Sequence, residues 1–345
     1  MRRVALREFF EGLRDRFRRN RGAAGSAGAT EDGGRWARLR SALPWKYILG
    51  GLVVVLALYY PVGMMLAHKV NDDVDYVAPE EFQVQGGSRA VSIAAALIDR
   101  EVTRTKWVAN KPWIFPSSAL DNMPNFQMGM VYAISRFAIE MTDALGRTRG
   151  SSQADPDLDK ASGLLKYDGT IWVWEPTTSL MPTASAERQY VAGQKALMRY
   201  NERLGEGQAV YDKRADNLIA FLDRIGADLG SASAALDMRA MESDAGWFDR
   251  RADDIFYATK GRLYGYYMLL REIGTDFEAV IKEKNVDAVW DQMLGSMRVA
   301  AAMDPLIVAN GANDGTFIPS HLAAQGFYLL RARTQLGEVE NILLK

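Results

Sequence analysis

YILGGLVVVLALYYPVGMMLA, residues 47–67, is one uninterrupted apolar run without a charge. As a helix it spans about 31 Å, which matches the hydrocarbon core of a bilayer. A cleaved signal peptide is the rival interpretation, but the run and its 46-residue leader are too long for one and Met65–Ala67 is a poor cleavage site. The run therefore predicts a transmembrane helix over residues 47–68, with these membrane residues: Tyr47, Leu52, Val55, Leu58 and Met64.

Charge is distributed unevenly on the two sides of this run. Residues 1–46 hold 12 Lys and Arg against 5 acids, a net of +7, whereas residues 68–345 carry −8. The positive-inside rule then places residues 1–46 in the cytoplasm and residues 69–345 in the periplasm of a bacterial inner membrane. The lipid bilayer is thus the first expected partner.

The N-terminal arm has two parts. Residues 3–19 place apolar side chains on one helical face among arginines, which is typical of an amphipathic helix lying on an anionic leaflet. The alternative is a partly disordered arm whose arginines only enforce the topology. Residues 22–34 (GAAGSAGATEDGG) have the composition of a flexible linker. The apolar face of the arm consists of Leu6, Phe9, Phe10, Leu13 and Phe17.

Residues 69–345 show mainly helical periodicity, as in the stripe Phe126, Met130, Ala133, Phe137 and Met141. Two stretches repeat every seven residues, which favours long helices that pack at shallow angles. Packing within one chain and a dimeric coiled coil are the two options, and mixed companion positions favour the first. One segment, residues 167–175 (YDGTIWVWE), is strand-like. The predicted fold is all-α: one transmembrane helix and a helical bundle with a small β-hairpin-like insertion. The heptad positions are Tyr190, Leu197, Leu204, Tyr211, Leu218 and Ile225, then Leu322, Leu329, Leu336 and Leu343.

Residues 253–311 contain DDIFYATKGRLYGYYMLLREIGTDFEAVIKEKN, then VWDQMLGSM, then VANG. With the single N-terminal anchor, this pattern resembles an uncharacterised family of proteobacterial inner-membrane proteins, domain of unknown function 2333. The resemblance covers the chain from about residue 45 onward. It implies an envelope protein and supplies no activity, so it carries over no catalytic residue. The matching positions are Phe256, Tyr257, Gly261, Tyr264, Leu269, Leu270, Asp276, Phe277, Asp291, Gln292, Asn310 and Gly311.

Several kinds of chemistry are excluded by residue type or motif. The chain has no cysteine, and its two histidines are His68 and His321, so disulfides, thiolate sites and most histidine catalysis are excluded. Phosphate-binding loops, G-x-S-x-G and HExxH are absent. Asp155, Asp157 and Asp159 resemble the start of a calcium loop, but Lys160 and Lys166 occupy its glycine and glutamate positions. We expect no cofactor, no metal site and no nucleic-acid partner.

Aromatic residues supply the sharpest binding candidates: Trp172 and Trp174 in the strand-like segment, and Trp113 and Phe115 in the loop KPWIFP. Indole faces stack on sugars, and Trp-x-Trp on a strand would place both rings on one side. A glycan strand or a lipid headgroup is therefore a possible ligand. Alternatively, these tryptophans only close one end of the helical bundle.

Hydrolysis of a glycan would require placed carboxylates. Glu140, beside an apolar stripe, is the first candidate for a catalytic carboxylate, and Glu101 and Glu242 follow; a salt-bridged or solvated role is the alternative for each. We expect a membrane-anchored envelope protein whose helical domain is a binding, scaffold or assembly module, with other envelope proteins or a glycan as partners. A homo-oligomer is left open. The alternative is a membrane-anchored peptidoglycan hydrolase or lyase that uses a carboxylate.

Overall fold

The computed structural model describes residues 45–145, 154–174, 181–242, 249–311 and 318–345. The chain divides into two compact units, residues 1–58 and 59–345. The predicted membrane span is a helix, α3, which runs from Trp45 to Ala67 and is long and apolar enough to cross a bilayer. Leu52, Val55 and Leu58 are exposed along it. The predicted amphipathic helix and linker of the arm lie outside the described residues.

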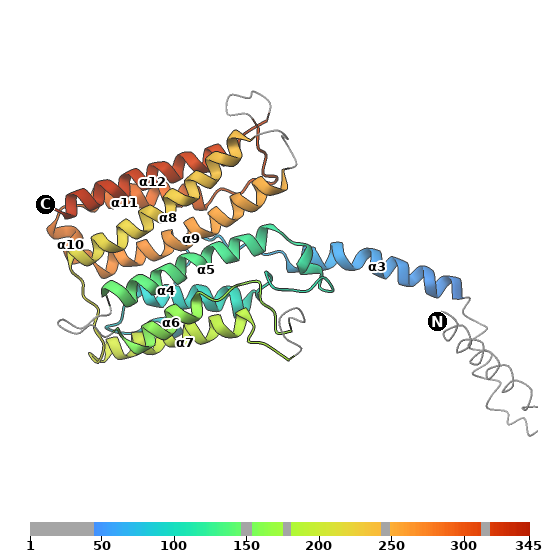
Figure 1. The fold of residues 1–345 in the computed structure, drawn as a ribbon, viewed down its shortest axis with the longest axis horizontal. Coiled ribbons are helices and arrows are strands. Elements are labelled where there is room, and N and C mark those ends of the chain that lie inside the picture. Colours follow the sequence, from blue (N-terminus) through green and yellow to red (C-terminus); the bar gives the residue numbers. More distant parts are fainter. Residues whose placement is uncertain (1–44, 146–153, 175–180, 243–248, 312–317) are drawn as a thin grey trace, which may run out of the picture. The chain divides into compact units, whose positions relative to one another are not determined.

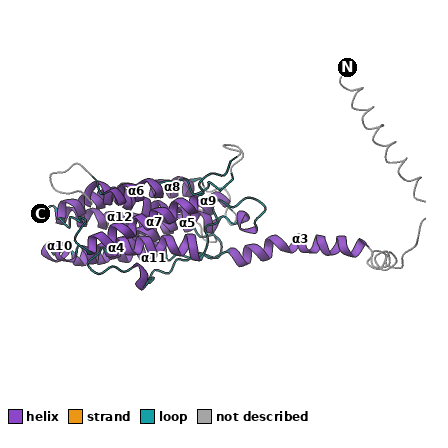
Figure 2. Ribbon diagram, turned by 90° about the horizontal axis from the view of Figure 1, so that it is seen from below, coloured by secondary structure: helices purple, strands orange, loops and turns teal. Residues whose placement is uncertain are grey.

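The second unit is built from helices, as predicted (Figure 1). Short 3₁₀ or π-helical turns adjoin them at Glu80–Phe82, Asp99–Arg104, Pro116–Ala119 and Met141–Leu145. Within the described residues there is no strand, and one isolated bridge joins Asn310 and Ser320 (Figure 2). The α-helices are α4 (Arg89–Ile98), α5 (Asn122–Glu140), α6 (Pro156–Leu165), α7 (Ala186–Gly205), α8 (Ala215–Met241), α9 (Arg250–Asp276), α10 (Glu278–Glu283), α11 (Asp287–Ala301) and α12 (His321–Leu343).

The predicted β-hairpin-like insertion is wrong for the part that is described. Residues 167–174 form a loop, and side chains from a neighbouring loop satisfy its backbone groups: the Trp107 indole donates to the Gly169 carbonyl (2.7 Å) and the Asn110 amide to the Ile171 carbonyl (3.0 Å). The backbone N–H groups of Ala186 and Thr183 also donate to the carbonyls of Ile171 (3.0 Å) and Val173 (2.8 Å), but these bonds form no strand within the described residues. The β-propensity of Ile171–Trp174 is therefore overridden by the surrounding contacts. The argument that a strand places Trp172 and Trp174 on one side therefore does not apply.

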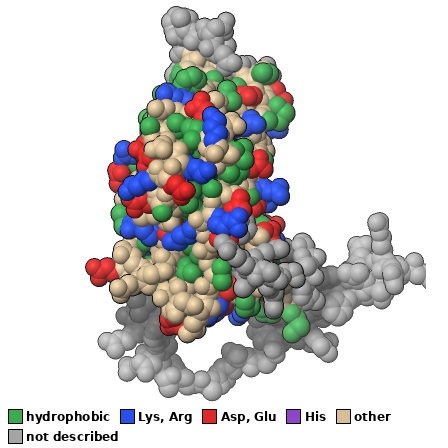
Figure 3. Space-filling view, turned by 90° about the vertical axis from the view of Figure 1, so that its left-hand side faces the viewer, with side chains coloured by type: hydrophobic (Ala, Val, Ile, Leu, Met, Phe, Trp, Pro, Cys, Tyr) green, Lys and Arg blue, Asp and Glu red, His purple; other side chains and the backbone are tan. Residues whose placement is uncertain are grey.

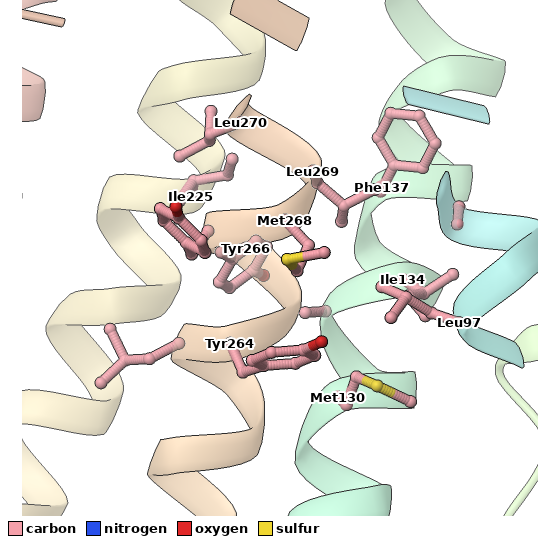
Figure 4. Close-up of a cluster of buried hydrophobic side chains, with 14 of the residues drawn as sticks. Leu97, Met130, Ile134, Phe137, Ile225, Tyr264, Tyr266, Met268, Leu269 and Leu270 are labelled. Carbon is pink, nitrogen blue, oxygen red and sulfur yellow. The ribbon is translucent and has the colours of Figure 1, made fainter. Parts of the chain in front are cut away.

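Helices α5 and α9 pack against each other at the centre of the bundle. Gly261 makes this possible, since a Cβ at that position would overlap the carbonyl of Phe126. Helix α6 packs on α5, α7 packs on α6, and α4 packs against both α9 and α7, while α8 and α11 pack on α9 and α12 packs on α8 and α11 (Figure 1). The core between them is continuous and includes Leu97, Phe137, Ile225 and Tyr264 from four different helices (Figure 4).

The two heptad series have different outcomes. Leu322, Leu329, Leu336 and Leu343 are all buried on the single helix α12. The first series is divided between two helices, because α7 ends at Gly205 and α8 begins at Ala215. Tyr190 and Leu197 on α7, and Leu218 and Ile225 on α8, are buried within this one chain. These heptad positions therefore serve packing inside the bundle.

The acids of the sequence DPDLDK organise the start of α6. The Asp155 side chain accepts hydrogen bonds from the backbone N–H groups of Asp157 and Leu158, and Pro156 occupies the first helical position, as expected for a helix N-terminus. Arg203 on α7 pairs with Asp155 (2.7 Å) and with Asp157 (2.8 Å). Capping and ion pairing thus account for two of the three acids that resemble a calcium loop.

Candidate functional site

Residues 70–76, which we call the strap, leave α3 and lie along α9. Three strap carbonyls accept hydrogen bonds from α9: the Tyr264 hydroxyl donates to Asp73 (2.9 Å), and Arg271 donates to Val74 (3.0 Å) and Tyr76 (2.7 Å). The contacts are spread over two turns of α9. The strap is therefore fixed along its length and is not a flexible linker.

Lys260 on α9 is the central charge of this attachment. Its side chain is completely buried, and its Nζ lies 2.5 Å from Oδ2 of Asp72 and 3.4 Å from Oδ1 of Asp304. A buried ammonium is costly unless it is paired. The pair therefore joins the strap to α9 and to the loop after α11.

A second buried pair lies beside the first. The helix begun by α4 continues as a π-helical stretch, Asp99–Arg104, in which Arg100 and Glu101 are both buried and form an ion pair of 2.9 Å. Arg100 also donates to the Asn71 carbonyl and to the Tyr264 hydroxyl, both at 2.7 Å. Burial opposes the charged form, yet Tyr264 and Glu101 raise the pKa of Arg100 above its ordinary value. We call Lys260, Asp72, Arg100 and Glu101, with the strap, the anchor clamp.

Sequence reasoning missed the anchor clamp, although its signals were present. Lys260 lies within the apolar stripe of residues 255–273, where a solvated lysine would not be expected. Asp72, Asp73 and Asp75 count toward the net charge of −8 after the apolar run, and two of them form ion pairs: Asp72 with Lys260, and Asp75 with Arg298 at 2.8 Å.

The predicted aromatic candidates lie in two loops at one end of the bundle. Trp113 is 80% exposed, and Phe115 and Trp174 are also exposed, while Trp172 is half-buried. Asn110 connects the two loops through its bond to the Ile171 carbonyl, and Lys111 pairs with Glu187 at the start of α7 (2.8 Å). The exposed rings are not packed inside the bundle, and a ligand role for these residues stays a prediction.

The loop that carries Trp113 also contacts the second half of α3. The Tyr59 hydroxyl donates to the Ile114 carbonyl (2.9 Å), and the Tyr60 hydroxyl donates to the Trp113 carbonyl. Gly63 leaves room for Pro116, whose ring a Cβ there would overlap. The segment Pro112–Pro116 is therefore held against α3 by both hydrogen bonds and close packing.

The three predicted carboxylates lie in three different environments. Glu140 is nearly buried near the end of α5, with Arg224 at 3.9 Å, and burial raises its pKa. Glu101 belongs to the anchor clamp, and Glu242 is exposed after α8, where it pairs with Arg239 at 3.1 Å. The structure therefore does not bring these acids together as a catalytic pair.

A different group of carboxylates lines a hollow where α5 and α9 begin. Asp121 and Asp253 face it together with Asn122, Leu306 and Ile307. Burial, assisted by repulsion from Asp121 and Asp254, raises the pKa of Asp253 to about 6. A carboxyl group with such a pKa can hold or release a proton near neutral pH. This hollow is the best candidate on the described residues for proton chemistry, and no sequence motif marked it.

His321 is the first residue of α12 and directly follows the capping residue Ser320. Its Nδ1 accepts a hydrogen bond from the backbone N–H of Ala309 (2.9 Å), and burial lowers its pKa. The contact joins the loop after α11 to the start of α12, which is a structural role.

Comparison with known proteins gives one family. A family model described as an uncharacterised protein conserved in bacteria matches residues 47–245 and 237–345, which together include the bundle and all but the first two residues of α3. Neither the curated proteins nor the solved structures give a match.

Proposed function

The chain belongs to the bacterial family of domain of unknown function 2333, and from this premise we propose that it is a membrane-anchored envelope protein whose helical domain works as a scaffold or assembly module. The anchor clamp carries the proposal. An enzyme that must reach a polymer away from the membrane benefits from a flexible linker. Here the connection between anchor and bundle is held by the buried pair of Arg100 and Glu101 and by the pair of buried Lys260 with Asp72. Such an attachment suits a module that presents its partners at a fixed height above the bilayer.

The proposed location is the bacterial inner membrane, with the N-terminus in the cytoplasm and residues 69–345 in the periplasm. The charge split of +7 against −8 on the two sides of the apolar run supports this orientation. Alkaline phosphatase, which is active only in the periplasm, should be active when fused after Lys345. An inactive fusion, together with an active cytoplasmic reporter at the same position, would reverse the topology.

A direct test of the scaffold proposal compares binding with cleavage. The full chain, purified in detergent, should release no soluble fragments from isolated peptidoglycan. Crosslinking in intact membranes, followed by mass spectrometry, should recover the same envelope proteins in repeated preparations. Loosening the clamp by Asp72→Asn should reduce that recovery while the helical content stays unchanged. Release of peptidoglycan fragments by the wild-type chain would instead support an enzyme.

The alternative of a carboxylate-dependent peptidoglycan hydrolase is kept because of Asp253. Its raised pKa and its place in a hollow with Asp121 are the properties that a general acid requires. If fragments appear, Asp253→Asn should abolish their release, whereas Glu338→Gln, at an exposed position on α12, should not. Glu140→Gln tests the carboxylate that the sequence suggested. It should leave the release of fragments unchanged if Asp253 is the general acid.

A further inference from the structure

The length of α3 restricts where the bilayer can lie. Charged Lys46 precedes the apolar run, so the hydrocarbon span cannot begin before Tyr47. From Tyr47 to Leu58 the helix rises about 18 Å, which is well short of a hydrocarbon core about 30 Å thick. The segment from Tyr59 to Ala67 must therefore also lie within the bilayer if α3 spans it.

The same segment of α3 is covered by the loop Pro112–Pro116. Tyr59 and Tyr60 bind the carbonyls of Ile114 and Trp113, and Gly63 packs against Pro116. Tyr59 lies eight residues before the end of α3, which is about 12 Å along the helix axis. We infer that the loop Pro112–Pro116 enters the leaflet on the bundle's side, beside α3, and that the end of the bundle around it rests on the bilayer. The inference rests on the proposed function in one respect, that α3 spans a membrane.

The chemistry of the loop suits a lipid environment. Trp113, Ile114 and Phe115 are exposed, large and apolar, and tryptophan is favoured at membrane interfaces. Irregular backbone is tolerated at membrane depth only where its polar groups find protein partners. Two carbonyls have the tyrosine hydroxyls of α3, and the Phe115 N–H donates to the Pro112 carbonyl (2.9 Å). Pro112 and Pro116 have no N–H to satisfy.

The surrounding surface extends this apolar character. Helices α5 and α9 begin at the same end, where the Asn125 amide bonds Asp254 (2.7 Å). The hollow that Asp121 and Asp253 line at this end is also lined by Leu306, which is 99% exposed, and by Ile307. Trp174 belongs to the neighbouring loop that Asn110 holds through Ile171. We call Trp113, Ile114, Phe115, Trp174, Leu306 and Ile307 the apolar end surface.

The opposite end of the bundle has a different composition. Figure 3 views that end, where basic and acidic side chains are distributed among apolar ones. Lys213, Arg214, Asp216, Glu283 and Lys284 lie there around Leu344. Exposed aromatic and aliphatic side chains that gather at one end of a soluble domain usually mark a binding site. Here its continuity with the membrane helix identifies the bilayer as the occupant.

The acids at the apolar end surface indicate how it would bind. Asp121, Asp253 and Asp254 outnumber Arg250 beside it, so attraction to anionic headgroups is not the basis of the contact. Insertion of apolar side chains should suffice, and zwitterionic lipid should support it as well as anionic lipid does.

The absence of native cysteine allows a direct test in the full chain. Single variants Leu52→Cys, Ile114→Cys, Leu306→Cys and Leu344→Cys, each labelled with a fluorescent nitrobenzoxadiazole, would be placed in phosphatidylcholine nanodiscs with or without acyl-chain-brominated lipid. All four native side chains are exposed in the folded chain, so labelling should leave the circular dichroism spectrum unchanged. Leu52 is the lipid-embedded reference, and Leu344 is the matched apolar control at the other end.

The expected result is strong bromolipid quenching at positions 52 and 114, clear quenching at 306, and quenching several-fold weaker at 344. Quenching at 114 and 306 as weak as at 344, with strong quenching at 52, would overturn the inference while leaving the anchor intact. Protection of position 114 from both bromolipid and aqueous iodide would mean that protein, such as a second copy, covers the loop, which also overturns it. No quenching at position 52 would instead show that α3 does not lie in the bilayer, which would contradict the membrane anchor of the proposed function.

Discussion

The buried Lys260 forms an ion pair with the partly exposed Asp72 in which Nζ and Oδ2 are 2.5 Å apart, and the pair joins the bundle to the segment that follows α3. The residues are far apart in the sequence, and neither belongs to a recognisable motif. Because the lysine is completely buried, Asp72 is the nearer of the two carboxylates that compensate for the loss of its hydration. The pair accordingly fixes the direction in which the chain leaves α3 along α9.

Asp72→Asn should reduce the free energy of unfolding of the full chain by about 3 kcal/mol, because it leaves Lys260 buried without its closest anion. The control is Asp75→Asn, which breaks an exposed pair with Arg298 and should cost about 1 kcal/mol or less. Chemical denaturation in detergent, followed by circular dichroism, measures both values. Equal small losses would show that the strap is not held by this ion pair.

Gly261→Ala should destabilise the bundle by about 1–3 kcal/mol, since the new methyl group would overlap the Phe126 carbonyl and separate α5 from α9. Gly337→Ala is the matched control. This glycine lies within α12 with open space around it, so alanine there should stabilise the helix by up to about 1 kcal/mol. Thermal unfolding should therefore shift in opposite directions for the two variants, and a shift in the same direction would contradict the close α5–α9 crossing.

Leu218→Ala should cost about 2–5 kcal/mol, because it opens a cavity at a fully buried position of α8. Leu218→Asp should reduce stability further, since it buries a charge without a partner. Phe327→Asp, at an exposed position of α12, controls for the introduction of charge into a helix and should have little effect on stability. If Leu218→Ala melts at the same temperature as the wild type, the side chain of Leu218 on α8 does not contribute to the core.

Asp253 should make stability depend on pH between about 4 and 6. Its folded pKa is raised to about 6 from 3.8, so the folded state binds more protons than the unfolded state in this range. The stability that this group contributes is complete below about pH 4 and is lost as pH rises through about 6. Asp253→Asn should therefore raise the melting temperature at pH 7.5 relative to the wild type and flatten the pH profile.

The matched control for the pH experiment is Glu338→Gln, an exposed carboxylate on α12. Its profile should follow that of the wild type. If Asp253→Asn leaves the stability difference between pH 4 and pH 7.5 unchanged, the hollow does not perturb this carboxyl, and the hydrolase alternative loses its supporting observation.

Local patterns predicted much of the fold. The apolar run at residues 47–67 corresponds to α3, which begins two residues earlier and ends at the same residue. This helix could be predicted because length and hydrophobicity are properties of the segment itself. The α12 heptad was also correct, because period alone decides which face of a helix is buried. The prediction of a strand at residues 167–174 was wrong for the described residues. The carbonyls of this segment are bonded by Trp107 and Asn110, about sixty residues away, and by the backbone of residues 183 and 186, and local β-propensity does not include such contacts.

The sequence by itself determined the long apolar helix α3, the helical class and the family of this protein, since each depends on residue order over short distances. Only the tertiary structure decided which charges meet. It buried Lys260 against Asp72, separated Glu101, Glu140 and Glu242, and gathered Asp121 and Asp253 in a hollow. It also laid the loop of Trp113 on α3. These are contacts between distant segments, and their energies depend on burial and geometry, which exist only once the helices have packed.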